Sequence, residues 1–327
     1  MHNYTELKNC INKYNDIVII THTNMDGDAL GSSTALCAAL RQLGKNAVVY
    51  VEDKIPDYLN VINHDVNKPD DVPYYVSVLN FKPEIAFAVD IGERSRLEDR
   101  VEAYDSAEVR LCIDHHQKHD DFADYSVVHE DYAAAGLLVY EFIKELGVNV
   151  TQDMAKALYT AIATDTGRFK YNSTTSEVLR AVAELYEYDI NASEICTAVF
   201  DSKPLVQLKA EAVALENVEI LAGGKVVVSY ITKDQMNKIG ALYEHVDTCI
   251  DRIRLIEGVE IAIFIKEKEV GLNKLSLRAK SYANVARLAG ELGGGGHEKA
   301  SGATLKCSLE EALIQAKAAA EREIARF

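Results

Sequence analysis

The sequence predicts an α/β protein with two domains, and three observations support this prediction. Apolar β-branched runs alternate with helical segments through the first half of the chain, which is typical of a parallel sheet with helices on both faces. At 327 residues, the chain exceeds the length of one typical core. The alternation loosens near the middle, and strands then return. We therefore expect an N-terminal domain at 1–187, a connector at 188–215 and a smaller α/β domain at 216–327.

The composition is that of an ordinary globular protein, with 48% hydrophobic and 26% charged residues. The formal net charge of −16 disfavours binding to long duplex nucleic acid, because proteins of that class present a basic face. No apolar run reaches the length of about 18 residues that predicts a membrane span, and the N-terminus lacks the order of a secretion signal. The six cysteines are widely scattered. We expect a cytoplasmic protein with reduced thiols and no membrane partner.

The loop after the first predicted strand is the most informative stretch. Residues 17–20 are β-branched and apolar, as in a buried strand, and a helix is expected at 29–43. The loop between them holds His22, Asp26 and Asp28. Two carboxylates this close repel each other unless a cation lies between them. One imidazole and two carboxylates therefore predict a divalent metal site.

Further strand ends carry the same kinds of side chain. Strands are expected at 46–51, 85–89 and 109–113. The second of these ends at Asp90, and the third ends at Asp114, His115 and His116. Asp165 follows a predicted helix. Because ligands bind beyond the carboxyl ends of the strands in such sheets, we expect these side chains to lie near the first loop.

The remaining elements follow from periodicity and capping signals. The other helices of the first domain are expected at 133–146, 153–164 and, after a capping box at Thr174 and Glu177, to about 186. In the second domain, strands are expected at 225–232, 259–266 and 274–280, and a last helix begins at the capping box of Ser308 and Glu311. A run of four glycines at 293–296 precedes His297. Successive glycines let backbone N–H groups converge on an anion.

Together, these motifs resemble the DHH phosphoesterase superfamily, which is named for the tripeptide. They read HTNMDGDALGS at 22–32, VDIG at 89–92, DHH at 114–116 and TDTG at 164–167. The stretch LGGGGHEKASG at 292–302 and the basic strand at 276–280 resemble the DHH-associated domain of type 1. Within that branch, the compact chain is similar to the nanoRNase group. The larger exonucleases of the superfamily carry extra nucleic-acid-binding domains, and the cyclic-dinucleotide hydrolases carry membrane spans.

The resemblance implies two divalent metal ions that activate a water for in-line attack on phosphorus. The first ion would be held by His22, Asp26 and Asp90. The ligands of the second would be Asp28, Asp90, His115 and Asp165, with Asp90 bridging the ions. Manganese is the expected metal, and magnesium, cobalt and iron are alternatives. Gly27 departs from the superfamily, which often has proline or another residue before each aspartate, and we expect it to loosen the loop slightly.

The resemblance also implies roles for residues that are not metal ligands. Asp114 would orient a histidine. His116 would donate to the phosphoryl oxygen or the leaving group. The expected phosphate-binding residues are Gly294, Gly295, Gly296, Arg278, His297 and, close to the metals, Arg168. His119 and the other histidines outside the motifs are interpreted as surface or structural.

The leading hypothesis is an enzyme that hydrolyses very short RNA to 5′-mononucleotides and dephosphorylates 3′-phosphoadenosine 5′-phosphate. A phosphodiesterase for linear dinucleotides such as pApA or pGpG shares every motif. A non-catalytic nucleotide or metal sensor is a third hypothesis, and the presence of all six expected ligand residues weighs against it. Metal identity, preferred substrate, cleavage polarity and oligomeric state are left open by the sequence, although a homodimer fits a scaffold of this kind.

Overall fold

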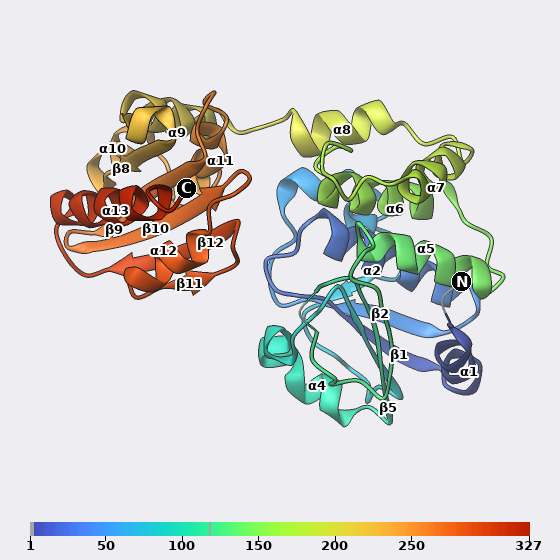
Figure 1. Ribbon diagram of the computed structural model, residues 1–327. Helices are drawn as coiled ribbons and strands as arrows, with labels where there is room; N and C mark the ends of the chain where they lie inside the picture. Colours follow the sequence, from blue (N-terminus) through green and yellow to red (C-terminus); the bar gives the residue numbers. More distant parts are fainter. Residues whose placement is uncertain (1–2, 118) are drawn as a thin grey trace. The chain divides into compact units, whose positions relative to one another are not determined.

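The computed structural model describes residues 3–117 and 119–327, and it consists of two compact units that divide between Ser202 and Lys203 (Figure 1). This division falls inside the segment expected to be a connector. That segment folds mainly into two helices, α8 (Ala192–Phe200) and α9 (Leu205–Glu216). The exact domain bounds given above stay a prediction.

The N-terminal unit is built on a six-stranded sheet in the order β3-β2-β1-β4-β5-β6, and every adjacent pair is parallel. Its strands are β1 (Asp16–Ile20), β2 (Asn46–Tyr50), β3 (Tyr75–Val76), β4 (Ile85–Val89), β5 (Val109–Asp114) and β6 (Tyr125–Val128). The predicted α/β class with a parallel sheet is confirmed. The edge strands β3 and β6 were not predicted, because they are short and lack a buried apolar run.

Helices cover both faces of this sheet, with α4 on the side opposite α2, α5 and α6 (Figure 1). The first face carries α1 (Thr5–Lys13), α2 (Gly27–Gln42), α5 (Ala135–Glu145), α6 (Gln152–Asp165) and α7 (Ser176–Tyr186). The other face carries η2 (Arg94–Arg100) and α4 (Val101–Ser106). Alternation along β1 sends Ile17 and Ile19 to the first core, and Val18 and Ile20 to the second. Short turns η1 (Asp57–Leu59) and α3 (His64–Asn67) lie beyond β2.

Two expected capping boxes have different outcomes. The cap of α7 is Thr175, whose hydroxyl accepts from the Val178 N–H at 3.4 Å, so the prediction of Thr174 was wrong by one residue. The cap of α13 (Leu309–Ile324) is Ser308, as predicted, and its hydroxyl accepts from the Glu311 N–H at 3.2 Å.

The C-terminal unit contains a six-stranded mixed sheet in the order β11-β12-β10-β9-β8-β7. Its strands are β7 (Glu219–Leu221), β8 (Val226–Ile231), β9 (Ile261–Glu269), β10 (Leu272–Ala279), β11 (Gly295–Gly296) and β12 (Ala300–Leu305). Helices α12 (Val285–Glu291) and α13 pack on one face. The other face is covered over β8 and β9 by α9, α10 (Lys233–Ile239) and α11 (Cys249–Arg254). Turns η3 (Ala222–Gly224) and η4 (Tyr243–Val246) complete the unit.

All six cysteines are free, as expected from their spacing. No helix in the described parts of the chain is long and apolar enough to cross a membrane.

Candidate metal centre

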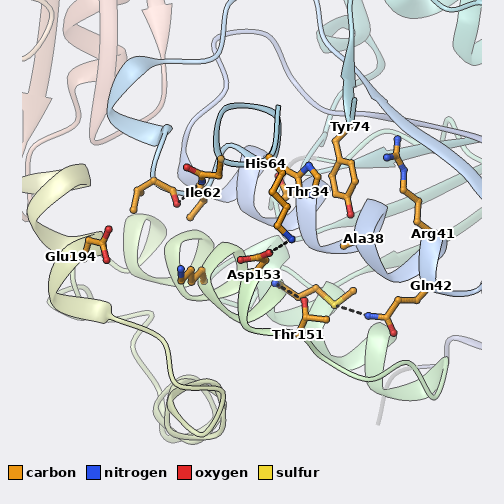
Figure 2. Close-up of a pocket in the computed structure, with 15 residues that line it drawn as sticks. Thr34, Ala38, Arg41, Gln42, Ile62, His64, Tyr74, Thr151, Asp153 and Glu194 are labelled. Atoms are coloured by element: carbon orange, nitrogen blue, oxygen red, sulfur yellow. Dashed lines mark hydrogen bonds and ion pairs between the residues drawn. The ribbon is translucent and has the colours of Figure 1, made fainter. Parts of the chain in front are cut away.

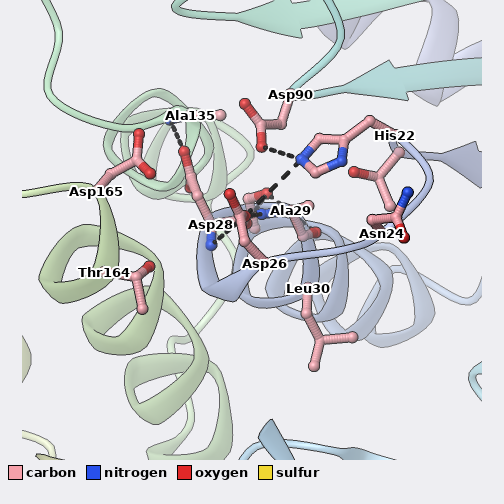
Figure 3. A network of polar contacts seen from close by, with 12 residues as sticks. His22, Asn24, Asp26, Asp28, Ala29, Leu30, Asp90, Ala135, Thr164 and Asp165 are labelled. Atoms are coloured by element: carbon pink, nitrogen blue, oxygen red, sulfur yellow. Dashed lines mark hydrogen bonds and ion pairs between the residues drawn. The ribbon is translucent and has the colours of Figure 1, made fainter. Parts of the chain in front are cut away.

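The expected ligands lie at the point where the strand order of the N-terminal sheet reverses. β1 and β4 are neighbours, and the chain proceeds from them toward opposite edges of the sheet. A crevice forms at the carboxyl ends of strands at such a switch point. β1 leads into the loop that holds His22, and β4 ends directly before Asp90. The topology therefore brings two segments together that are far apart in the sequence (Figure 3).

The first group of candidate ligands surrounds the imidazole of His22. Its Nε2 lies 3.4 Å from Asp90 Oδ2 and 3.8 Å from Asp26 Oδ1. The other ring nitrogen, Nδ1, is 2.8 Å from the carbonyl oxygen of Thr23, a contact that favours the Nδ1–H tautomer and leaves Nε2 to face the carboxylates. Asp26 Oδ1 also accepts two backbone N–H groups in the first turn of α2, both at 3.0 Å. This cap fixes the carboxylate that faces His22.

The second group surrounds His115. Its Nε2 lies 3.2 Å from Asp165 Oδ2, 3.5 Å from Asp90 Oδ1 and 3.6 Å from Asp28 Oδ2. Its Nδ1 contacts the carbonyl oxygen of Tyr132 at 3.1 Å, so Nε2 again faces the acidic groups. Asp90 therefore directs one oxygen to each histidine, the arrangement that a bridging carboxylate requires.

These residues fit a pair of divalent cations. His22, Asp26 and Asp90 form one group, and Asp28, His115 and Asp165 form another, in each of which the donor atoms lie within 4.8 Å of one another. Mixed imidazole and carboxylate donors suit metals such as manganese. Asp90 Oδ1 is buried and has no hydrogen-bond partner among the described residues, which is costly unless a cation binds it. Asp90 also has a left-handed backbone, with φ 61°, a strain that is typical of functional sites.

The electrostatics of the centre also favour a bound cation. Burial, and then the nearby charge of Asp90, raise the pKa of Asp165 to about 7. Burial likewise raises the pKa of Asp28, with Asp90 and Asp165 adding to it. Burial alone would lower the pKa of His115, but the close carboxylates of Asp90, Asp28 and Asp165 raise it to about 10. A cation bound among these carboxylates would favour their ionised forms.

Asp28 is held by backbone donors that the sequence analysis missed. Its Oδ2 accepts from the N–H of Ala135 at 2.6 Å, and its Oδ1 accepts from the N–H of Gly136 at 2.9 Å (Figure 3). Both donors belong to the first turn of α5, where the helix dipole favours a carboxylate. The only local sign of these donors in the sequence is the run of small residues at the start of α5. That run does not indicate a contact with Asp28.

Glycines in α2 allow α6 to approach closely. A Cβ on Gly27 would lie 2.4 Å from Thr164 Cγ2, and a Cβ on Gly31 would lie 2.3 Å from the carbonyl oxygen of Ala157. We expected Gly27 to loosen the loop. The structure shows instead that a glycine is needed here because a larger side chain would clash with Thr164. The close approach of α2 and α6 brings Asp165, at the end of α6, toward the loop that carries the first ligands.

Asp114 lies behind the centre, at the end of β5, and is fully buried. Its Oδ1 accepts from His116 Nδ1 at 2.7 Å, and its Oδ2 accepts from His119 Nδ1 at 2.9 Å. Although burial raises the pKa of Asp114, these two hydrogen bonds outweigh it and hold that pKa well below its usual range. The bond to Asp114 raises the pKa of His116. His119, interpreted from the sequence as surface or structural, joins this network.

Arg168 has partners within its own unit. One guanidinium nitrogen, Nη1, lies 2.8 Å from Asp201 Oδ1, and the guanidinium carbon lies 4.6 Å from the centroid of the Phe200 ring. These contacts join the loop after α6 to the end of α8. A phosphate-binding role for Arg168 stays a prediction, and it would require this ion pair to be shared or exchanged.

The expected phosphate-binding residues of the C-terminal unit meet at the β11 edge of the sheet. Arg278 on β10 is opposite Ala300 on β12, and Gly295 and Gly296 pair with the same strand. Leu277 points into the core, so Arg278 points to the other face. Residues 293–297 are all exposed. The structure therefore gathers Arg278, the glycines and His297 around β12. The N–H groups of Gly293, Gly294 and His297 donate to carbonyl oxygens of the same unit.

One cavity of about 460 Å³ in the N-terminal unit lies away from the predicted ligands (Figure 2). Thr34 and Arg41 line it from α2, and Thr151 and Asp153 line it from the beginning of α6. The candidate metal ligands lie at the opposite ends of these two helices. None of the predicted site residues lines this cavity. We therefore place the functional site at the metal centre.

The fold and the site define a class: an α/β protein with a histidine–carboxylate centre for divalent metals at the switch point of a parallel sheet. Comparison with known sequences gives the family. The chain belongs to the DHH family, whose N-terminal domain matches residues 16–162, and a DHHA1 domain matches residues 223–326.

The chain is similar to curated proteins over nearly its whole length. It is 34% identical to the bifunctional oligoribonuclease and PAP phosphatase NrnA of Thermus thermophilus, over 95% of this chain and 90% of the relative. It is 26% identical to the protein of the same name from Bacillus subtilis, over 92% of this chain and 93% of the relative. The crystal structure of an exopolyphosphatase-related protein from Bacteroides fragilis has the same fold, with a TM-score of 0.88, 24% identity, and coverage of 97% of this chain and 95% of that one.

Proposed function

We propose that this protein is a metal-dependent phosphoesterase that hydrolyses very short oligoribonucleotides to 5′-mononucleotides and removes the 3′-phosphate from 3′-phosphoadenosine 5′-phosphate. One observation carries the proposal: the two ligand groups that share Asp90 occur in a chain that aligns over 95% of its length with an oligoribonuclease and PAP phosphatase. Both substrates present a phosphate ester on a nucleoside, and one centre for in-line hydrolysis serves both.

The residues divide into ligands and donors. The proposed metal ligands are His22, Asp26, Asp28, Asp90, His115 and Asp165. Two divalent ions in these positions, manganese being our choice, would supply Lewis-acid activation of water and stabilisation of phosphoryl charge. Asp114 holds His116 through Nδ1. The other ring nitrogen, Nε2, would donate a proton to the phosphoryl oxygen or to the leaving oxygen. Arg278, His297 and the backbone of the glycine run bind a substrate phosphate.

A substrate panel in the presence of manganese tests the proposal. The panel contains RNAs of two to five nucleotides, 3′-phosphoadenosine 5′-phosphate, pApA and pGpG, with product release followed by chromatography. We expect turnover of the short RNAs and of the bisphosphate, and about two metal ions per chain after dialysis. Turnover restricted to pApA or pGpG would favour the dinucleotide phosphodiesterase. Binding without turnover of any member would leave the sensor hypothesis.

A further inference from the structure

The loop after the DHH tripeptide contributes a second imidazole to Asp114. The backbone of Asp114 is fixed by β5, and its carbonyl oxygen accepts from the His129 N–H at 3.0 Å. Its side chain is fixed by different means, since each carboxylate oxygen accepts one imidazole N–H. His116 takes one oxygen, and His119 takes the other. Two donors on two oxygens determine the rotation of the carboxylate, which one donor would leave free to turn.

The position of His119 is set by the segment that follows Asp90. The N–H of the next residue, Asp120, donates to the carbonyl oxygen of Gly92 at 2.7 Å. The carboxylate of Asp120 accepts from the backbone N–H of Arg94 at 3.1 Å. These bonds join the loop after β5 to the loop after β4. The ring of His119 is thereby held in a fixed place relative to the shared carboxylate of Asp90.

Only one ring nitrogen of His119, Nδ1, makes a hydrogen bond to the described residues. Its Nε2 is buried and has no hydrogen-bond partner among the residues that the structure describes. The ring packs against Phe122, with centroids 5.7 Å apart. A buried ring nitrogen without a partner is unfavourable, so the ring is retained here at a cost. Among the described residues, its hydrogen-bond partner is Asp114, which it contacts through Nδ1.

We propose that His119 is a positioning residue for the proposed phosphoester hydrolysis. It holds the carboxylate of Asp114, and Asp114 in turn holds the ring of His116 through Nδ1, which leaves Nε2 free of this bond. This inference rests on the proposed function and adds to it a residue outside the four motifs. Because His119 acts through Asp114, which is not one of the proposed metal ligands, its loss should affect turnover and leave metal binding intact.

Three substitutions at one position test the proposal. An asparagine amide reaches about as far as Nδ1 of histidine, so His119→Asn keeps the donor to Asp114. The longer His119→Gln places its amide nearer to the position of Nε2, and His119→Leu has no donor. Because outer partners of catalytic groups typically contribute about 10–100-fold to activity, we expect kcat to fall by roughly that factor in the leucine and glutamine variants. We expect His119→Asn to stay within about threefold of wild type, with KM and bound manganese unchanged in all three.

A second background separates positioning from a general structural role. In a His116→Ala protein, His119→Leu should cause no further loss of kcat, because the ring that it positions is absent. Equal losses in the asparagine and leucine variants, additive losses in the His116→Ala background, or a loss of bound manganese would each overturn the proposal. Circular dichroism and thermal unfolding check that the variants are folded. If the leucine variant is unfolded, the difference in kcat between the asparagine and glutamine variants tests the proposal.

A readout without turnover distinguishes failure of this inference from failure of the proposed function. The Nδ1–H proton of His116, hydrogen-bonded to a buried carboxylate, should give a downfield resonance in the NMR spectrum of the wild-type protein. We expect the resonance to remain in His119→Asn and to shift or broaden in His119→Leu. If wild type hydrolyses no member of the panel, the proposed function fails, and this resonance still decides whether His119 positions His116.

Discussion

The two units differ in the burial and charge of the residues that we propose for phosphate chemistry. The N-terminal centre is buried and acidic, with side chains from distant segments fixed by backbone bonds and by a strained Asp90. The C-terminal edge is rich in exposed glycine, and the half-buried Arg278 lies on β10, which pairs with the same strand β12. The first arrangement attracts cations, and the second suits an anion. We therefore expect substitutions in the N-terminal centre to act on metal content and turnover, and substitutions at the C-terminal edge to act on substrate affinity.

Removing the shared carboxylate is the strongest test of the N-terminal half of this comparison. Asp90→Ala takes away an oxygen from each ligand group, and we expect turnover to fall by roughly 10³-fold or more because several kcal/mol of charge stabilisation are lost. Metal analysis after dialysis should show at most one bound ion. The control is Asp99→Ala, an exposed aspartate on η2, which should behave as wild type. Manganese-dependent turnover that survives Asp90→Ala would show that the centre is not the site of hydrolysis.

The C-terminal half is tested by Arg278→Ala. A charge-assisted hydrogen bond to phosphate contributes about 1.5–3 kcal/mol, so we expect KM to rise roughly 10–100-fold. Bound manganese should remain as in wild type. Lys268→Ala, which removes an exposed cation from the neighbouring strand β9, is the matched control and should leave KM unchanged. If Arg278→Ala lowers metal content instead of affinity, the division of labour between the two units is wrong.

The glycine run provides a matched pair that sharpens the description of this edge. A Cβ on Gly294 would lie 2.1 Å from the carbonyl oxygen of Gly302, whereas a Cβ on Gly295 would meet no atom within 4 Å. Overpacking of this kind typically costs about 1–3 kcal/mol, so Gly294→Ala should lower the free energy of unfolding by that amount. Gly295→Ala should change it by less than about 0.5 kcal/mol. Urea titration of both variants gives the comparison, and equal destabilisation would contradict the packing around β12.

The sequence predicts the features that have a local pattern, and it does not predict the contacts between distant segments. Ligand types at the ends of apolar strands are a local signal, and Asp90 and His115 were identified in that way. The donors that hold Asp28 lie 107 and 108 residues further along the chain, and a contact between such distant segments leaves no local pattern. The partner of Arg168, Asp201, was hidden for the same reason. His119 lay outside every motif, and only the folded structure shows its hydrogen bond to Asp114.

A buried carboxylate of the C-terminal unit should make the stability of this unit depend on pH. Glu260 is 4% exposed and accepts four hydrogen bonds, three from the backbone N–H groups of residues 281–283 and one from the Ser281 hydroxyl. Burial alone would raise the pKa of Glu260, but these bonds lower it overall. A carboxyl group with a lowered pKa stabilises the fold above its unfolded pKa, which is about 4.3. This stabilisation is lost as the pH falls below that value and through the folded pKa.

Glu260→Gln isolates this contribution, because the amide has a similar shape but does not titrate. At pH 7 we expect the variant to be less stable by about 1–3 kcal/mol, because a neutral amide oxygen accepts the three N–H bonds more weakly than a carboxylate does. Its NH₂ group replaces the oxygen that accepts from the Ser281 hydroxyl. The difference in the free energy of unfolding between wild type and variant should stay constant from pH 7 to about pH 5 and shrink as the pH falls further. Urea unfolding of both proteins from pH 7 to pH 3 measures this difference. A difference that stays constant down to pH 3 would contradict the link between the hydrogen bonds and the lowered pKa. One that grows toward acid would mean that the carboxyl is held in its protonated form, so that burial outweighs the four donors.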